Sequence, residues 1–227
     1  MKAWENPYAP GRKIVVITGY GAAEILYAAA DFADDYKALA RRSDRCPMLR
    51  AFNYPSYHNT HPDYYINTAP VVKRRGIWTW GHTIYDYRSF MDNMLLLKLN
   101  ELVIWNDYAP INADEIVNYA HELGIKLIWG FAWGWGTDCS VSAKLDDESL
   151  HQLRDDIVAK YEKEYLHSGC DGIYFQSFTE LNQERIGGIL IAEAVTEFVN
   201  RTSALFYEKY PDIELQFGLH ATSVKHQ

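Results

Sequence analysis

The stretch Gly76-Ile77-Trp78-Thr79-Trp80 opens a series of short apolar runs. The later runs are LVIWN at 102–106, KLIWGF at 126–131, GIYFQ at 172–176 and IELQF at 213–217. Runs of this length, rich in β-branched and aromatic residues, are typical of strands buried on both faces. Segments with helical spacing separate them at 87–99, 112–123, 146–167 and 185–210. The alternation predicts a parallel sheet with helices outside it.

Two architectures share this alternation, namely an open doubly wound sheet and a (β/α)8 (TIM) barrel. A doubly wound nucleotide-binding sheet has a glycine-rich turn after its first strand, and Gly81-His82-Thr83 is not such a turn. Each predicted strand ends instead in polar or aromatic residues, which is where barrel enzymes build their sites. We therefore expect an α/β fold in which residues 73–227 form an incomplete (β/α)8 barrel of about five β-α units.

The predicted barrel is short, because a complete one needs at least about 200 residues and eight strands. We expect the chain to be the N-terminal portion of a longer protein, with a complete five-stranded domain as the alternative. Residues 1–72 precede the barrel as a predicted small α/β domain and linker. In it, 1–12 is Pro-rich and irregular, 13–18 is a strand, and 22–42 is a helix that ends in basic residues, as helix C-termini favour.

Composition excludes several classes of protein. The net charge of −8 disfavours a nucleic-acid partner, which normally requires a basic face. No apolar run approaches the roughly 20 residues that span a bilayer. No signal peptide is visible at the N-terminus, and the sequence assigns neither a compartment nor an oligomeric state. The three cysteines, Cys46, Cys139 and Cys170, are widely spaced, so we expect free thiols rather than disulfides or structural zinc.

Aromatic residues gather at the predicted strand ends. Of the seven tryptophans, six lie at or just after these ends: Trp78, Trp80, Trp105, Trp129, Trp133 and Trp135. An indole offers a flat apolar face and one polar group, which suits stacking on a sugar ring but also suits a core. Our candidate substrate-binding residues at the strand ends are Trp105, Asn106, Trp133, Trp135, Gln176, Thr179 and His220.

Asp107 and Glu180 follow two of these strands and form a candidate catalytic pair. Glycoside hydrolysis needs one carboxylic acid to protonate the leaving oxygen and a second carboxylate near the developing positive charge. Aromatic walls raise the pKa of a carboxyl group by desolvation, as a general acid requires. Taken singly, Asp107 equally fits a turn residue and Glu180 a solvated loop acid.

Other chemistries have weaker patterns. His82, Asp107 and His220 lack metal-binding spacing, so no metal is predicted, and no cofactor is implied. Ser177 lies in Gln-Ser-Phe rather than G-x-S-x-G, which disfavours a serine nucleophile. The Gly-Tyr-Gly at 19–21 lacks the full G-x-G-x-x-G pattern of a dinucleotide site.

The segment Arg75-Gly76-Ile77-Trp78, the later Leu97-Lys98-Leu99-Asn100, and the strand that follows resemble the barrel opening of family 20 β-hexosaminidases. Residues 13–42, with Tyr27-Ala28-Ala29 in the helix, resemble the small domain that precedes such barrels. The resemblance implies that Glu180 is the general acid and that Arg75 binds sugar hydroxyls. Thr179 stands where the family has the Asp that orients the substrate acetamido group, so the resemblance does not extend to acetamido-assisted catalysis.

The sequence therefore predicts a glycosidase: a hexosaminidase-like glycoside hydrolase that acts on an oligosaccharide or glycoconjugate by carboxylate acid catalysis. A non-catalytic carbohydrate-binding protein on a degenerate barrel is the competing hypothesis, since such a protein would also have lost the orienting Asp. A sugar-phosphate or metal-dependent barrel enzyme is third, because its phosphate site usually follows strands seven and eight, which the prediction does not contain.

Overall fold

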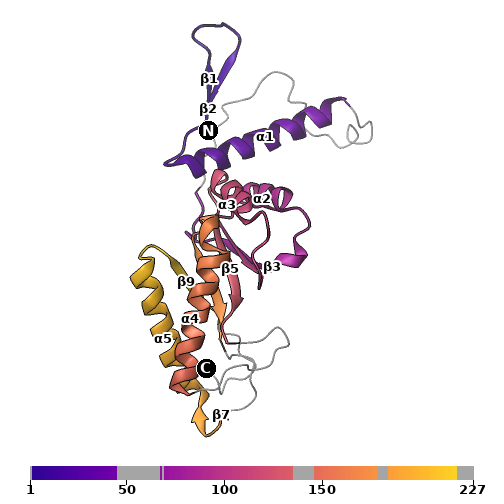
Figure 1. Ribbon diagram of the computed structural model, residues 1–227. Helices are drawn as coiled ribbons and strands as arrows, with labels where there is room; N and C mark the ends of the chain where they lie inside the picture. Colours follow the sequence, from indigo (N-terminus) through magenta and orange to yellow (C-terminus); the bar gives the residue numbers. More distant parts are fainter. Residues whose placement is uncertain (1, 45–66, 68, 135–145, 178–183, 219–227) are drawn as a thin grey trace. The chain divides into compact units, whose positions relative to one another are not determined.

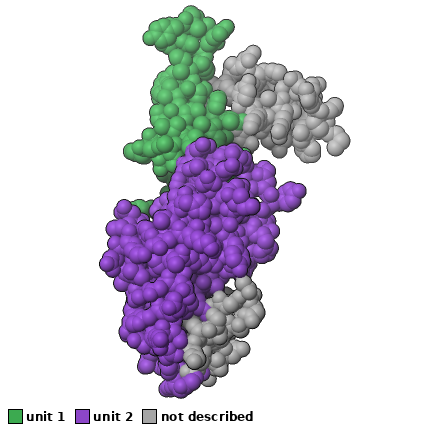
Figure 2. All heavy atoms as spheres, viewed as in Figure 1, with its two compact units in different colours: residues 1–75, 91–100 green, residues 76–90, 101–227 purple. Residues whose placement is uncertain are grey.

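The computed structural model describes residues 2–44, 67, 69–134, 146–177 and 184–218. The chain forms two compact units, coloured separately in Figure 2. Unit 1 comprises residues 1–75 and 91–100, and unit 2 comprises residues 76–90 and 101–227. Helix α2 (Tyr87–Leu96) contributes to both units. The division into domains at residues 72 and 73 stays a prediction.

Unit 1 begins with an antiparallel hairpin of β1 (Lys2–Glu5) and β2 (Lys13–Val16), followed by α1 (Ala22–Asp44). The predicted strand and helix are confirmed, but β1 lies where we expected irregular chain. The two prolines of this region, Pro7 and Pro10, lie in the loop. Proline has no backbone N–H, and at these positions no hydrogen bond between β1 and β2 is lost. The loop is closed by the amide of Asn6, which donates to the carbonyl of Arg12 at 2.8 Å.

Unit 2 is built on a parallel five-stranded sheet (Figure 1). Its strands are β3 (Gly76–Trp80), β4 (Glu101–Trp105), β5 (Lys126–Ala132), β6 (Gly172–Gln176) and β9 (Glu214–Phe217), in that spatial order. Each strand pairs with the next sheet strand along the chain, without the reversal of order that defines a doubly wound sheet. The predicted α/β fold with five successive strands in barrel order is confirmed. Among the described residues, β3 and β9 are its edge strands.

Short and long helices connect the strands. They are η2 (Gly81–Thr83), α2, α3 (Ala113–Glu122), α4 (Asp147–Glu164), η3 (Leu166–Ser168) and α5 (Ile191–Lys209). Helix α4 begins at a side-chain cap, because Asp146 accepts a hydrogen bond from the amide of Ser149 at 2.9 Å.

The predicted helix at 185–210 is wrong over its first six positions. These residues form a hairpin of β7 (Arg185–Ile186) and β8 (Ile189–Leu190). Gly187 and Gly188 connect the strands with φ of 58° and 87°. Two successive positive φ angles give a two-residue turn whose twist matches a hairpin, and glycine adopts them without strain. Helix α5 therefore begins only at Ile191.

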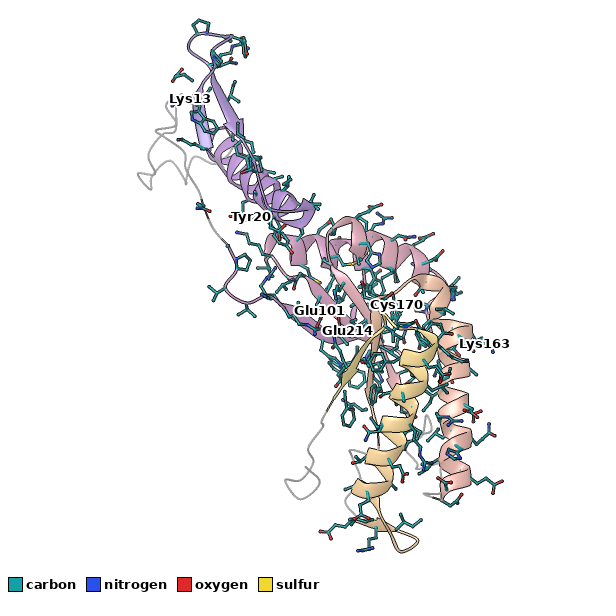
Figure 3. The ribbon with its side chains drawn as sticks, turned by 90° about the vertical axis from the view of Figure 1, so that its left-hand side faces the viewer. Lys13, Tyr20, Glu101, Lys163, Cys170 and Glu214 are labelled. Atoms are coloured by element: carbon teal, nitrogen blue, oxygen red, sulfur yellow. The ribbon has the colours of Figure 1, made fainter. Side chains whose placement is uncertain are left out.

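One face of the sheet is covered by helices. Trp133 follows β5 and is fully buried, with its ring stacked 3.6 Å from that of Phe175 and 5.7 Å from that of Phe206 in α5. Phe131 stacks on Tyr165 at the end of α4, at 5.1 Å. Figures 1 and 3 show α4 and α5 side by side. The core of unit 2 therefore lies between these helices and the odd-numbered residues of β5 and β6.

The other face changes in character from one end of the strands to the other. Glu101 and Glu214 stand at the amino ends of β4 and β9 (Figure 3). Lys126, at the start of β5, forms an ion pair with Glu214 at 3.0 Å. The carboxyl ends of the same strands carry aromatic side chains instead, so the two ends of this face offer different chemistry.

Candidate functional site

The strand register aligns one row of side chains near the carboxyl edge of the sheet. The row contains Trp80, Trp105, Gly130, Tyr174 and Gln216, one from each strand. Aligned positions on neighbouring strands point to the same face, and alternate residues point to opposite faces. The row therefore lies on the face opposite to the buried core.

Three residues of this row and the nearby Trp78 make an aromatic cluster, by which we mean Trp78, Trp80, Trp105 and Tyr174. Ring centroids lie 4.9 Å apart for Trp78 and Trp80, 5.9 Å for Trp80 and Trp105, and 6.0 Å for Trp105 and Tyr174. All three pairs meet edge to face, the arrangement that the quadrupoles of aromatic rings favour. Each ring of the cluster therefore packs against at least one other ring of the cluster, which restricts its orientation.

The cluster is also open to solvent on one side. Trp78 is 38% exposed and Trp80 is 44% exposed, whereas Trp105 is 8% exposed. Adjacent exposed indoles form an apolar patch, and patches of this kind mark binding surfaces on many proteins. The two exposed rings, backed by the buried one, offer a rigid apolar surface to a ligand.

Glycines make room for the cluster. A Cβ at Gly130 would lie 3.2 Å from Trp105 Cε3 and 3.2 Å from Tyr174 Cδ1, so a side chain there would push these two rings apart. A Cβ at Gly218, just after β9, would overlap the Tyr174 hydroxyl. Gln176 donates to this hydroxyl through Nε2 at 3.0 Å, which places a side-chain amide beside the cluster.

The segment after β4 carries Asn106 and Asp107 and is fixed by backbone hydrogen bonds to β5 and to Tyr165. The amide of Asn106 donates to the carbonyl of Gly130 at 2.7 Å, and its own carbonyl accepts from the Tyr165 hydroxyl at 2.6 Å. Burial, reinforced by the nearby Glu164 and Asp107, raises the pKa of Tyr165 well above its usual range, so this hydroxyl remains a donor. The Asn106 side chain lies against Gly81, where a Cβ would come within 3.2 Å of its Cγ.

Asp107 is positioned through its backbone more than through its carboxylate. Lys160 of α4 donates from Nζ to the Asp107 carbonyl at 2.5 Å. Its ammonium group also lies 5.2 Å from the Tyr108 ring centre and 5.3 Å from that of Phe131. Among the described residues, the carboxylate oxygen Oδ1 accepts one long hydrogen bond, from the amide of Ala132 at 3.5 Å.

The structure brings four predicted site residues to this edge: Trp105, Asn106, Asp107 and Gln176. Two predicted binding residues lie elsewhere. Trp133 has both ring faces covered by Phe175 and Phe206, so the stacking role that we predicted for it is wrong. The predicted residues Trp135, Thr179, Glu180 and His220 lie outside the described part of the chain.

Arg75 is the second residue that the prediction misplaced. It precedes β3 and so lies at the amino edge of the sheet, about 15 Å from the carboxyl edge along a five-residue strand. Its guanidinium donates to the carbonyls of Val72 at 2.6 Å, Lys73 at 2.9 Å and Lys98 at 2.6 Å. Arg75 is therefore a structural residue of unit 1 and not part of the cluster.

Our candidate list missed Trp78, Trp80, Tyr174 and Lys160. Trp78 and Trp80 were recognised as strand-end tryptophans but not selected as binding residues. In the observed register Trp78 pairs with Val103 and Trp80 pairs with Trp105. Trp78 and Trp80 therefore share a face with the selected residue Trp105, and this alignment identifies them as binding candidates. No sequence signal pointed to Lys160, because its contact with Asp107 depends on how α4 packs.

No group of three or more His, Cys, Asp or Glu side chains within the described ranges is arranged to hold a metal ion. Of the helices that the structure describes, none is long and apolar enough to cross a bilayer.

No protein family and no curated protein sequence matches the chain. Among solved structures, an O-GlcNAc hydrolase of Thermobaculum terrenum, solved as a mutant, aligns with 64% of this chain and 34% of its own, at 16% identity and a TM-score of 0.47. The structure of the protein CpGH84B aligns with 64% of this chain and 27% of its own, at 13% identity and a TM-score of 0.48.

A cycloisomaltooligosaccharide glucanotransferase of Paenibacillus sp., complexed with cycloisomaltoheptaose, aligns with 63% of this chain and 30% of its own, at 10% identity and a TM-score of 0.44. The chain thus spans about a third or less of the length of each of these proteins. The likenesses are too distant to transfer a function to this chain.

Proposed function

We propose that this chain is a hexosaminidase-like glycoside hydrolase that binds an oligosaccharide or glycoconjugate on the aromatic cluster. The observation that carries the proposal is the pair of half-exposed indoles, Trp78 and Trp80, braced by Trp105 at the carboxyl edge of a parallel sheet. Sugar rings have apolar faces that stack on indoles, and this edge is where barrel enzymes place their sites. Gln176 supplies an amide beside the rings for sugar hydroxyls.

The proposed chemistry uses two carboxyl groups. Glu180, in the segment after β6, would transfer its proton to the glycosidic oxygen as the bond between that oxygen and the anomeric carbon breaks. Asp107, whose carboxylate accepts one long hydrogen bond among the described residues, would stabilise the positive charge that develops on the sugar. Water then adds to the anomeric carbon and loses a proton to a carboxylate. Trp135, Thr179 and His220 stay proposed substrate contacts.

The test is Glu180→Gln, which keeps the shape of the side chain but removes the proton. We expect turnover of glycosides with poor leaving groups to fall about 10²–10⁴-fold, the usual contribution of acid–base catalysis. Aryl glycosides with acidic leaving groups need little protonation and should be affected much less. Release of 4-nitrophenol and of a simple alcohol from matched glycosides measures the two cases.

Glu184→Gln is the matched control, because Glu184 is exposed and follows the same strand. It should leave both rates unchanged. Equal loss with both kinds of leaving group in Glu180→Gln would point to a binding or folding role for Glu180. An unchanged rate would remove it from the mechanism and leave Asp107 as the candidate acid.

A non-catalytic carbohydrate-binding protein is the second candidate function. Thr179, at the position of the family's orienting Asp, favours it. Such a protein would bind oligosaccharides through the aromatic cluster and release no alcohol from any glycoside. Binding that Trp80→Ala abolishes, together with no detectable turnover, would establish this function instead.

A further inference from the structure

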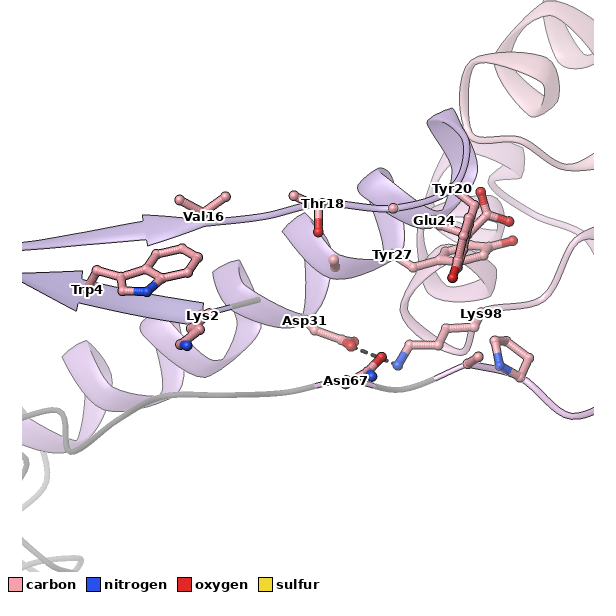
Figure 4. A pocket seen from close by; sticks show the side chains of 14 residues that line it. Lys2, Trp4, Val16, Thr18, Tyr20, Glu24, Tyr27, Asp31, Asn67 and Lys98 are labelled. Carbon is pink, nitrogen blue, oxygen red and sulfur yellow. Dashed lines mark ion pairs between the residues drawn. The ribbon is translucent and has the colours of Figure 1, made fainter.

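Unit 1 contains a cavity of its own, seen in Figure 4. Its volume is about 490 Å³, within the range of small-molecule sites. The walls come from the β1–β2 hairpin, the first turns of α1, Asn67, Ala69, Pro70 and Lys98, all of which belong to unit 1. The cavity is therefore separate from the aromatic cluster of unit 2.

One end of the cavity is formed by an exposed indole. Trp4 of β1 is 46% exposed, while its neighbour Ala3 is 6% exposed, because alternate strand residues point to opposite faces. The ammonium group of Lys2 lies 5.1 Å from the Trp4 ring centre. Nearly half of the Trp4 side chain is thus available to a ligand.

The other end of the cavity carries paired charges. Asp31 of α1 and Lys98 form an ion pair at 2.7 Å, with side chains that are 29% and 28% exposed. Figure 4 shows the two side-chain tips pointing toward each other, with Asn67 beside them. This end therefore presents fixed acceptors and donors side by side, and a hydroxyl group can use both because it donates and accepts.

The charges of the cavity wall cancel. Lys2 and Lys98 contribute two positive charges, and Glu24 and Asp31 contribute two negative charges. An anionic or cationic ligand would have no net attraction to this wall. A neutral ligand with a flat apolar face and several hydroxyl groups matches both ends.

Tyr27 is a buried residue of the cavity wall. Its side chain is 5% exposed, and Arg75 Nη2 lies 3.5 Å from its hydroxyl. Arg75 is itself held by three backbone carbonyls, so this part of the wall is anchored to the segment around residue 73. A preformed wall of this kind lowers the ordering cost of binding.

We propose that this cavity is a second saccharide-binding site, which holds a neutral oligosaccharide with one sugar on Trp4 and hydroxyl groups on the Asp31–Lys98 pair. The choice of a saccharide among neutral polar ligands rests on the proposed function. The site itself needs no catalysis.

Calorimetric titration of the full chain with cellopentaose, maltopentaose and chitopentaose tests the proposal. For at least one of these probes we expect Trp4→Ala and Asp31→Asn each to weaken a binding event tenfold or more. Trp80→Ala should leave that event intact and remove only binding to the cluster. Val15→Ala is the matched control, because Val15 pairs with Ala3 on the opposite face of the hairpin from Trp4.

Trp4→Phe keeps an aromatic ring and should retain part of the affinity, which separates stacking from the folding of the hairpin. Circular dichroism verifies that each variant is folded. Binding that is unchanged in Trp4→Ala and Asp31→Asn, or the absence of binding to all three probes, would overturn the proposal. Binding that depends on Trp4 in a protein without glycosidase activity would support this site while contradicting the proposed function.

Discussion

Trp133→Ala should destabilise unit 2 severely without acting on ligand binding directly. The indole is fully buried and is stacked on Phe175 at an interplanar angle of 3° and on Phe206 at 14°. Burying a large aromatic side chain removes about 150–250 Å² from water, and about 25 cal/mol per Å² gives a transfer term of about 4–6 kcal/mol. Measured substitutions of this kind cost about 3–5 kcal/mol, and we expect a loss of about 4 kcal/mol.

Urea denaturation followed by circular dichroism measures this loss, with Trp80→Ala as the comparison. Trp80 is 44% exposed, so its removal should cost much less stability. Because about 4 kcal/mol is a large part of the stability of an ordinary domain, Trp133→Phe provides a milder second variant. A loss below about 1 kcal/mol in Trp133→Ala, accompanied by weaker saccharide binding, would refute the assignment of Trp133 to the core and restore it as a binding residue.

Three further predictions concern local features of unit 2. In Gly172→Ala, the new Cβ would overlap the backbone oxygen of Glu214, so we expect β6 and β9 to separate and urea unfolding to report a loss of about 1–3 kcal/mol; unchanged stability would contradict this pairing. Asp146→Ala removes the cap of α4 and should cost about 1 kcal/mol in the same assay, whereas Asp146→Asn should keep most of it. Burial raises the pKa of the Cys170 thiol from 9.0 to about 11, so at pH 8 iodoacetamide should label it far more slowly than in the urea-unfolded chain. The labelling is measured in a Cys46→Ser, Cys139→Ser background, and equal labelling rates in the folded and unfolded chain would exclude a buried thiol. The same rise in pKa predicts that the thiol contributes stability below pH 9 and that this contribution declines as the pH rises toward 11.

The sheet was predictable because its signals are local. Each apolar run of five or six residues between helical segments became a strand, as at β5 (Lys126–Ala132). The hairpin at 185–190 was not recognised, although its Gly187-Gly188 pair is a hairpin signal, because helical spacing further along the segment dominated the interpretation. β1 was missed because two prolines nearby suggested irregular chain throughout.

The site was only partly predictable, because a strand pattern shows which residues share a face but not which face the helices cover. Trp129 and Trp133 share one face of the segment through β5, and Phe206 of α5 covers that side. This packing decides that Trp133 is core, whereas Trp80 and Trp105 form a surface. The misplacement of Arg75 was avoidable, since a residue that precedes a parallel strand lies at the edge opposite to its carboxyl end.

The edge-to-face contact of Trp78 and Trp80 also has an optical consequence. Two indoles held with ring centroids 4.9 Å apart and planes at 79° couple their electronic transitions, which gives a bisignate band in the circular dichroism spectrum. The sign and size of such a band depend on the relative orientation of the two rings, not on helix content. Trp105 lies within 6.4 Å of both rings and couples to them as well, so the protein contains its own label-free reporter for the aromatic cluster, able to register a disturbance there while the helices remain intact.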